Sequence, residues 1–207
     1  MVLIYQKLNG LIIRITIMII KNTQLNYGIV SISLHWLMAI LIIGLFVLGK
    51  YMIDLDLYNS NYHLAPQIHK SVGIMVFGFL LVRLIWRLIN LTPSPLSNYK
   101  KYELKLAKII HISFYIFIFV ACCSGYLIST ATGVGVDIFN SVNIPSLLVL
   151  NENQAEIVAE IHELSVHILL FLFALHMVGA LKHHFLDRDI TLRRMFATSV
   201  KEPLNNL

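Results

Sequence analysis

Charge is scarce in this chain. Asp, Glu, Lys and Arg make up 13% of its 207 residues, whereas 57% of the residues are apolar. The sequence also lacks the period-two alternation of half-buried strands, repeats at solenoid spacing, and any Pro or Gly cluster that would mark a second domain. These absences leave one all-α domain embedded in a membrane as the economical interpretation.

Cysteine is rarer still. Cys122 and Cys123 are the two cysteines, and as chain neighbours they are too close for an ordinary disulfide. Neither belongs to a C-x-x-C-H motif, which excludes the usual covalent attachment of a c-type haem. We expect both to be plain buried thiols.

Four apolar runs approach the twenty or so residues that a membrane-spanning helix needs. They cover residues 31–48, 68–91, 104–129 and 161–186. We predict a four-helix bundle that spans the membrane, with a loop at 92–101 that contains Pro93 and Pro95. The connection at 137–160 includes an apolar stretch, 144–150, that is too short to span, so we expect it to lie along the membrane surface or to dip into it.

Basic residues lie almost entirely on one side of these helices. The loops at 49–67 and 130–160 have Lys50 and Lys70 as their only nearby bases, and the other 14 of the 16 Lys and Arg residues fall on the opposite side. Acids gather near the same two loops: Asp54, Asp56, Asp137, Glu152, Glu156, Glu160 and Glu163. Because Lys and Arg accumulate in cytoplasmic loops, we predict that both termini are cytoplasmic. The net charge of +5 then reflects topology, and binding to nucleic acid is not expected.

Residues 1–26 form an N-terminal extension. Its apolar stretch at 8–20 is interrupted by Arg14 and lacks the small-residue cleavage site of a signal peptide. We expect either an interfacial helix or translation that starts at Met18, in which case residues 1–17 are not translated. At the other end, we expect residues 198–207 to be a cytoplasmic tail.

Histidine spacing gives the clearest indication of function. His162 and His176 lie 14 residues apart in one apolar run, so their side chains return to within about 40° of the same face and stand about 21 Å apart. By depth, His35 matches His176 near the cytoplasmic end, and His69 matches His162 near the outer end. Ionisable groups are unfavourable inside a bilayer and therefore indicate function. Two neutral imidazoles from facing helices can hold one iron, so we predict two non-covalent b-type haems suited to one-electron transfer.

Other histidines compete for these roles. His111 lies about two turns into the third predicted helix and has the depth to replace His35 or His176. A hydrogen bond to a quinone or to a haem propionate is its expected role. His167 lies about 140° round the helix from His162, and we expect it to be packed or bonded to another helix. Ordinary solvated or headgroup-level positions are expected for His63, His183 and His184.

Three basic residues are candidates for binding the carboxylates of the haems. Arg83 follows His69 by 14 residues and so lies on the same face at the cytoplasmic depth, where a guanidinium can pair with a propionate. Arg87 is either a second such residue or an anchor that extends to the lipid headgroups. Lys70, adjacent to His69, is the candidate at the outer haem.

Several motifs occur together between residues 27 and 195. SLHWL at 33–37 opens the first predicted helix, HKSVG at 69–73 opens the second, and VRLIWR at 82–87 closes it. Ala107, His111 and Tyr115 follow in the third helix, and the tail contains HHFLDRD at 183–189 and LRRM at 192–195. In this combination the chain resembles the bacterial cytochrome b561 proteins, which share a domain with the cytochrome b subunits of nickel-iron hydrogenases. It departs from their pattern in its N-terminal extension and in the Cys122-Cys123 pair.

The resemblance implies a cytochrome b561 domain at 27–197, with ligands to two b haems at His35, His69, His162 and His176. It also implies a protein surrounded by lipid in the bacterial inner membrane, with electron transfer coupled to the quinone pool and ubiquinone as the redox partner. Two alternatives stay open: oxidation of superoxide with ubiquinone as acceptor, and relay of electrons for a periplasmic redox protein. Acidic outer loops suit a basic partner and weaken the attraction of superoxide, unless Lys50 and Lys70 create a local positive region.

Overall fold

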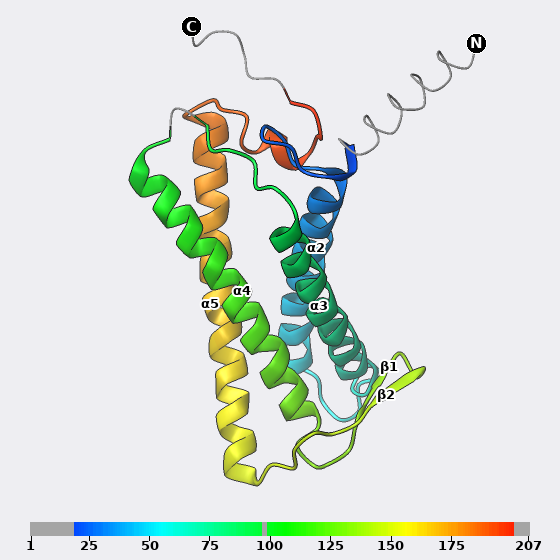
Figure 1. The fold of residues 1–207 in the computed structure, drawn as a ribbon. Helices are drawn as coiled ribbons and strands as arrows, with labels where there is room; N and C mark the ends of the chain where they lie inside the picture. The colour runs from blue at the N-terminus through cyan, green and yellow to red at the C-terminus, as the bar shows by residue number, and fades with distance from the viewer. Residues whose placement is uncertain (1–18, 97–98, 201–207) are drawn as a thin grey trace, which may run out of the picture.

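Four long helices dominate the structure, a computed structural model that describes residues 19–96 and 99–200 (Figure 1). They are α2 (Ile29–Ile53), α3 (Leu64–Ile89), α4 (Lys101–Ser129) and α5 (Glu152–Phe185). All four are long and apolar enough to cross a membrane. The predicted start at Met18, most of the N-terminal extension and the end of the predicted tail lie outside the described residues.

The predicted spans are confirmed as helices, with one large error in their boundaries. Helix α5 begins at Glu152 and not near residue 161, so the connection before it is shorter than predicted. Asn151 caps this helix: its side chain accepts a hydrogen bond from the Gln154 backbone at 2.9 Å, and the Gln154 side chain accepts one from the Asn151 backbone at 3.1 Å. The reciprocal cap stabilises the first turn of α5 well before the apolar run begins.

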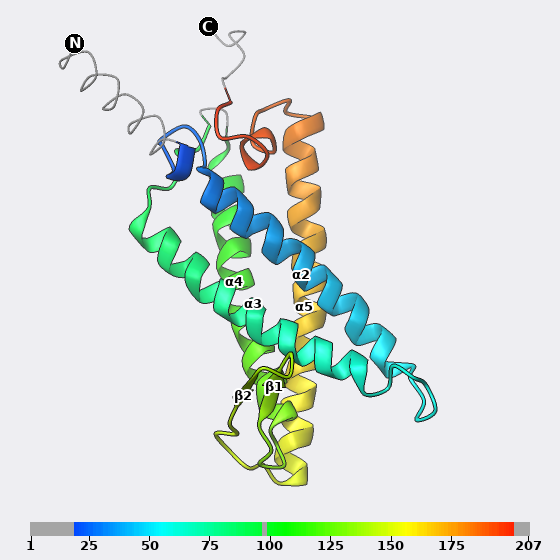
Figure 2. The same ribbon diagram turned by 90° about the vertical axis from the view of Figure 1, so that its right-hand side faces the viewer.

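A short, unexpected β-hairpin fills part of the connection between α4 and α5. Strands β1 (Val136–Ile138) and β2 (Val142–Ile144) pair antiparallel beside the N-terminal end of α3 (Figure 2). Phe139 and Asn140 make the turn with φ of 48° and 56°. Ser71 of α3 accepts a hydrogen bond from the Phe139 backbone at 3.1 Å. The connection therefore folds onto the end of the bundle.

The helices pack as two pairs, α2 along α3 and α4 along α5, which are joined by contacts between α3 and α4. A small buried core lies where the pairs meet, formed by Met38, Val76, Leu80, Ile118, Ala121 and Leu169. Many other large apolar side chains are exposed on the outside, among them Ile40 and Leu88. Such an exposed apolar surface is unfavourable in water and is typical of helices that face lipid.

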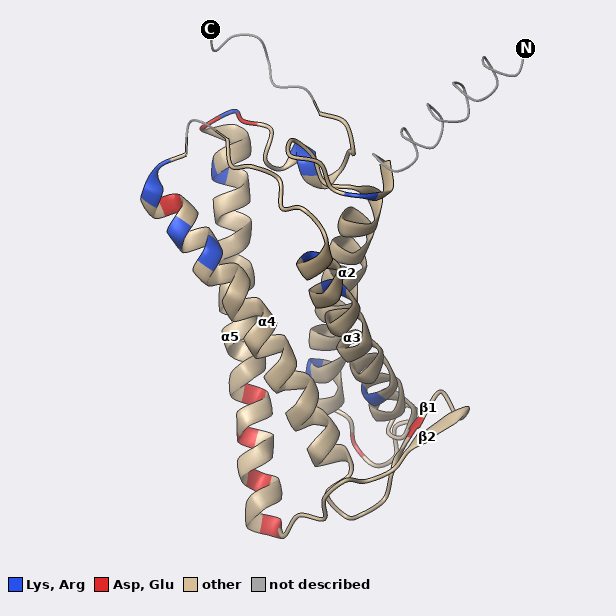
Figure 3. Ribbon diagram, in the orientation of Figure 1, with Lys and Arg blue, Asp and Glu red and all other residues tan. Residues whose placement is uncertain are grey.

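Charge separates along the bundle. Basic residues dominate the end where α2 and α4 begin and α3 and α5 finish, and acidic residues line the other half of α5 (Figure 3). We call these the basic end and the acidic end. The separation agrees with the pattern expected from the sequence, and the assignment of the basic end to the cytoplasm stays a prediction.

The segment after α5 folds back over the basic end. It contains the short 3-10 helix η1 (Arg193–Met195). Trp36 of α2 donates a hydrogen bond from Nε1 to the Met195 carbonyl at 2.6 Å, and its ring packs against Phe196 with a centroid separation of 4.8 Å. Arg194 is buried and donates to the Ser94 carbonyl at 3.0 Å. These contacts hold the segment against α2 and the α3–α4 loop.

Trp36→Phe is expected to loosen this segment without unfolding the bundle. Phenylalanine keeps a ring against Phe196 and removes the bond to the Met195 carbonyl, so local protection should fall by about 0.5–1.5 kcal/mol. Amide hydrogen exchange across residues 190–197 measures the change. Trp86→Phe is the matched control, because Trp86 Nε1 bonds to the Ser31 hydroxyl at 3.0 Å. Equal exchange of residues 190–197 in both variants would contradict the assignment.

Candidate functional site

The structure brings His35 of α2 and His176 of α5 together near the basic end. Their ring centroids are 6.3 Å apart, and the rings make an angle of 61°. Both side chains are half-buried. The two histidines reach each other from the two different helix pairs, so the space between the pairs contains this part of the site.

The second pair, His69 of α3 and His162 of α5, lies toward the acidic end with a centroid separation of 6.5 Å and an angle of 71°. Each ring lies over a glycine. A Cβ added at Gly49 would meet His69 Cε1 at 3.3 Å, and one added at Gly125 would meet His162 Cε1 at 3.0 Å. Because glycine has no side chain, both imidazoles can approach the backbone of a neighbouring helix.

His111, the alternative ligand candidate at the basic end, also lies beside His176, with a centroid separation of 5.4 Å. Phe114, on the same helix, contacts the His176 ring edge to face at 5.7 Å. Three histidines from three helices therefore surround one point of the bundle. Distance alone does not remove His111 from the candidates.

Arg83 and Arg87 both lie at the basic-end pair. Arg83 approaches Nδ1 of His35 at 3.2 Å and donates from Nε to the Tyr115 hydroxyl at 3.4 Å. Arg87 places its guanidinium 5.7 Å from the centre of the Tyr115 ring, a cation–π contact. Tyr115 had no expected role beyond its place in the motif, although its position four residues after His111 puts the two on one face. Lys70 is half-buried beside His69.

The expectation for His167 was wrong. Its side chain is exposed, and Nδ1 pairs with the Glu163 carbonyl of its own helix at 3.0 Å. The rotation of about 140° from His162 points it away from the other helices. Cys122 and Cys123 are free thiols, each half-buried.

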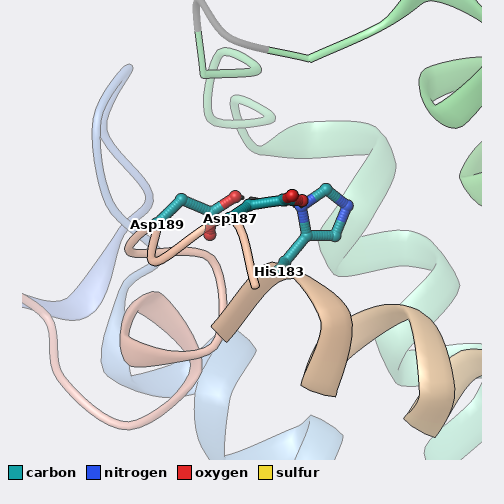
Figure 4. Close-up of side chains that lie close together, drawn as sticks. All are labelled: His183, Asp187 and Asp189. Carbon is teal, nitrogen blue, oxygen red and sulfur yellow. Dashed lines mark hydrogen bonds and ion pairs between the residues drawn. The ribbon is translucent and has the colours of Figure 1, made fainter. Parts of the chain in front are cut away.

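His183, which was expected in a solvated or headgroup-level position, belongs to a polar cluster at the C-terminal end of α5 (Figure 4). Its Nδ1 lies 2.9 Å from Asp187 Oδ2 and 3.0 Å from Asp189 Oδ2. These three groups are close enough to hold a metal ion. Lys182, however, already supplies a positive charge to Asp187 at 2.8 Å and to Glu103 at 2.6 Å. We interpret the cluster as an ion-pair network that joins the C-terminal segment to α4 and α5.

Comparison with known proteins identifies the family. The family model for prokaryotic cytochrome b561 matches residues 26–198. This chain belongs to the prokaryotic cytochrome b561 family. It is 39% identical over 178 residues to cytochrome b561 homolog 2 of Escherichia coli (strain K12), which covers 86% of this chain and 95% of the relative.

Two further relatives are more distant. Cytochrome b561 homolog 1 of Escherichia coli (strain K12) is 27% identical over 165 residues, covering 80% of this chain and 93% of the relative. A probable superoxide oxidase of Yersinia pestis is 26% identical over 172 residues, covering 82% and 95%. As a cytochrome b561, the chain is a multi-pass bacterial membrane protein that binds b-type haem and transfers electrons.

The histidine pairs fit this cofactor. Two imidazole nitrogens on opposite sides of one metal ion, each about 2 Å from it, put the ring centroids about 6 Å apart. The observed separations are 6.3 and 6.5 Å. In addition, Nδ1 of His69 is buried and has no hydrogen-bond partner among the described residues. Histidine nitrogens are ordinary axial ligands of haem iron.

Gly125→Ala is expected to reduce the haem content of the purified cytochrome. The new Cβ would lie 3.0 Å from His162 Cε1 and 3.2 Å from Nδ1, so the ring must move. Alanine stabilises a helix by about 1 kcal/mol relative to glycine. A loss of haem therefore cannot come from a lower helix propensity. The haem-to-protein ratio from a pyridine haemochrome assay measures the effect.

Gly78→Ala is the control, because a Cβ at Gly78 meets nothing within 4 Å. A ratio that is the same in both variants would contradict the view that Gly125 positions His162.

Proposed function

We propose that this cytochrome holds two b haems, one between His35 and His176 and one between His69 and His162. The observation that carries the proposal is the pair of matched centroid separations, 6.3 and 6.5 Å. Both pairs include a histidine of α5, and 14 residues separate the two along that helix. At about 1.5 Å per residue, the helix places its two ligands about 21 Å apart, near opposite sides of a bilayer core.

Each proposed haem position has basic groups beside it. At the basic end, Arg83 and Arg87 would bind haem propionates, since a guanidinium matches a carboxylate and stays charged. Lys70 would do so at the acidic end. His111 and Tyr115 lie among the same groups and offer hydrogen bonds to a propionate or a quinone. Haem would supply a one-electron couple when bound, and the two imidazoles of each pair would hold it.

The proposed activity is electron transfer through the bacterial inner membrane, coupled to the quinone pool with ubiquinone as the redox partner. The separation of charge between the two ends supports an orientation in which the basic end and both termini are cytoplasmic (Figure 3). Residues 27–197 form the proposed cytochrome b561 domain.

Oxidation of superoxide with ubiquinone as acceptor is the second candidate. The likeness to a probable superoxide oxidase supports it. The acids of the outer half of α5 oppose it, because they repel an anion and suit a basic redox protein instead. Relay of electrons for such a periplasmic protein is the third arrangement compatible with this surface.

Single histidine variants test the two-haem proposal. His35→Ala and His162→Ala should each lower the haem-to-protein ratio from about two to about one, because each removes one axial ligand from one site. Reduced-minus-oxidised visible spectra with protein quantification provide the measurement. His167→Ala is the matched control on the same helix, since His167 is exposed, and it should keep both haems.

The same measurement on His111→Ala shows whether His111 or His35 is the ligand that pairs with His176 at the basic end. Full haem content is the expected result. Loss of one haem in this variant, together with full content in His35→Ala, would overturn the proposed ligand set.

Proteoliposomes distinguish the candidate activities. With the cytochrome in vesicles that contain ubiquinone, a soluble quinol analogue should reduce the haems without any protein partner. Superoxide, generated outside by xanthine oxidase, should give no reduction beyond a sample with superoxide dismutase. Reduction that depends on superoxide, with formation of ubiquinol, would replace quinone-coupled transfer with the superoxide oxidase reaction.

A further inference from the structure

One proposed ligand, His162, has hydrogen-bond acceptors on its second ring nitrogen. Nδ1 lies 2.9 Å from the Ala121 carbonyl and 3.2 Å from the Ser124 hydroxyl, both on α4. A carbonyl oxygen only accepts hydrogen bonds, so Nδ1 must carry the proton. Nε2 of the neutral ring then keeps its lone pair and is the nitrogen that can bind iron.

Ser124 is placed to act as an acceptor. Its side chain is buried at 4% exposure, and its hydroxyl donates to the Val120 carbonyl at 2.7 Å. With its proton used there, the oxygen offers a lone pair to His162 Nδ1. Gly125, the next residue, leaves the space that brings the ring to this part of α4.

The basic-end pair has the opposite arrangement. Nδ1 of His35 faces the Arg83 guanidinium at 3.2 Å, and a guanidinium has no acceptor and carries a positive charge. His162 and His35 therefore differ in what faces Nδ1: an acceptor carbonyl and hydroxyl at His162, and a guanidinium at His35.

We propose that Ser124, together with the Ala121 carbonyl, is a positioning residue that fixes the tautomer of His162 and gives the acidic-end haem the lower reduction potential. The inference rests on the proposed ligation by His162. Acceptors on the second nitrogen raise the basicity of a ligating imidazole, which favours the ferric state. A cation near the other pair favours the ferrous state, whose net charge is less positive by one.

A lower reduction potential at the acidic-end haem would favour electron transfer toward the basic-end haem. The residues around His162 would then favour electron transfer from a haem held at the acidic end to one held at the basic end. Ser124 contributes by holding electron density on His162.

A redox titration of the full-length dihaem cytochrome with the Ser124→Ala substitution tests the proposal. The low-potential wave should shift to higher potential while the other wave stays in place, so more than half of the low-potential haem is reduced at its wild-type midpoint. The electron paramagnetic resonance spectrum of that ferric haem should change as well, because it reports ligand basicity. The His35→Ala variant, which is expected to keep the acidic-end haem, assigns the wave.

Ser165→Ala is the matched control. Ser165 is a buried serine of α5 at 3% exposure, and its hydroxyl bonds to the Ile161 carbonyl at 2.7 Å. Both waves should stay in place in this variant. An unchanged low-potential wave in Ser124→Ala, at full haem content, would overturn the proposal, and so would an equal shift in the two serine variants. Selective loss of the acidic-end haem in Ser124→Ala alone would support it.

The proposed ligand set and the proposed role of Ser124 can be disproved independently of each other. If His162→Ala keeps two haems, the proposed function loses its acidic-end site, whatever Ser124→Ala shows. If His162→Ala loses one haem and the Ser124→Ala wave does not move, the ligand stands and the role of Ser124 is rejected.

Discussion

The rotation of one helix, α5, fixes the positions of both histidine pairs. His162 and His176 point to the same side of the helix because 14 residues complete almost four turns. Since α4 packs along α5, any rotation of α5 would move both histidines away from their partners at once. The Asn151 cap at one end and the Lys182 ion pairs at the other hold the helix at its termini. Both histidine pairs therefore depend on the rotation of a single helix.

Helical periodicity and depth were sufficient to pair His35 with His176 and His69 with His162, because both depend only on position along regular helices. The structure brings the same residues together. His167 shows the limit of this reasoning: its rotation was correct, but whether another helix covers that face depends on packing. The start of α5 was missed because the reciprocal Asn151 cap precedes the apolar run, although its Asn-x-x-Gln pattern is visible in the sequence.

The contacts between helices could not be predicted from the sequence for a different reason. The bond from His162 to Ala121 and Ser124 depends on how α4 crosses α5 and on the space left at Gly125. Nothing in the spacing of residues in one helix fixes that crossing. The β-hairpin was hidden as well, since Phe139 and Asn140 adopt positive φ without the glycine that usually marks such a turn.

The difference between the two histidine pairs matters most in an energised membrane. In the proposed orientation, an electron that passes from the acidic end to the basic end moves toward the cytoplasm. The cytoplasm is the electrically negative side of an energised membrane. Crossing the full potential would cost about 2.3 kcal/mol per 100 mV. A basic-end haem of higher potential would offset part of this cost. On the proposed ligand set, the acceptors beside His162 would lower the potential of the acidic-end haem, which is the direction that this transfer needs, and the packing of the helices already holds them in place.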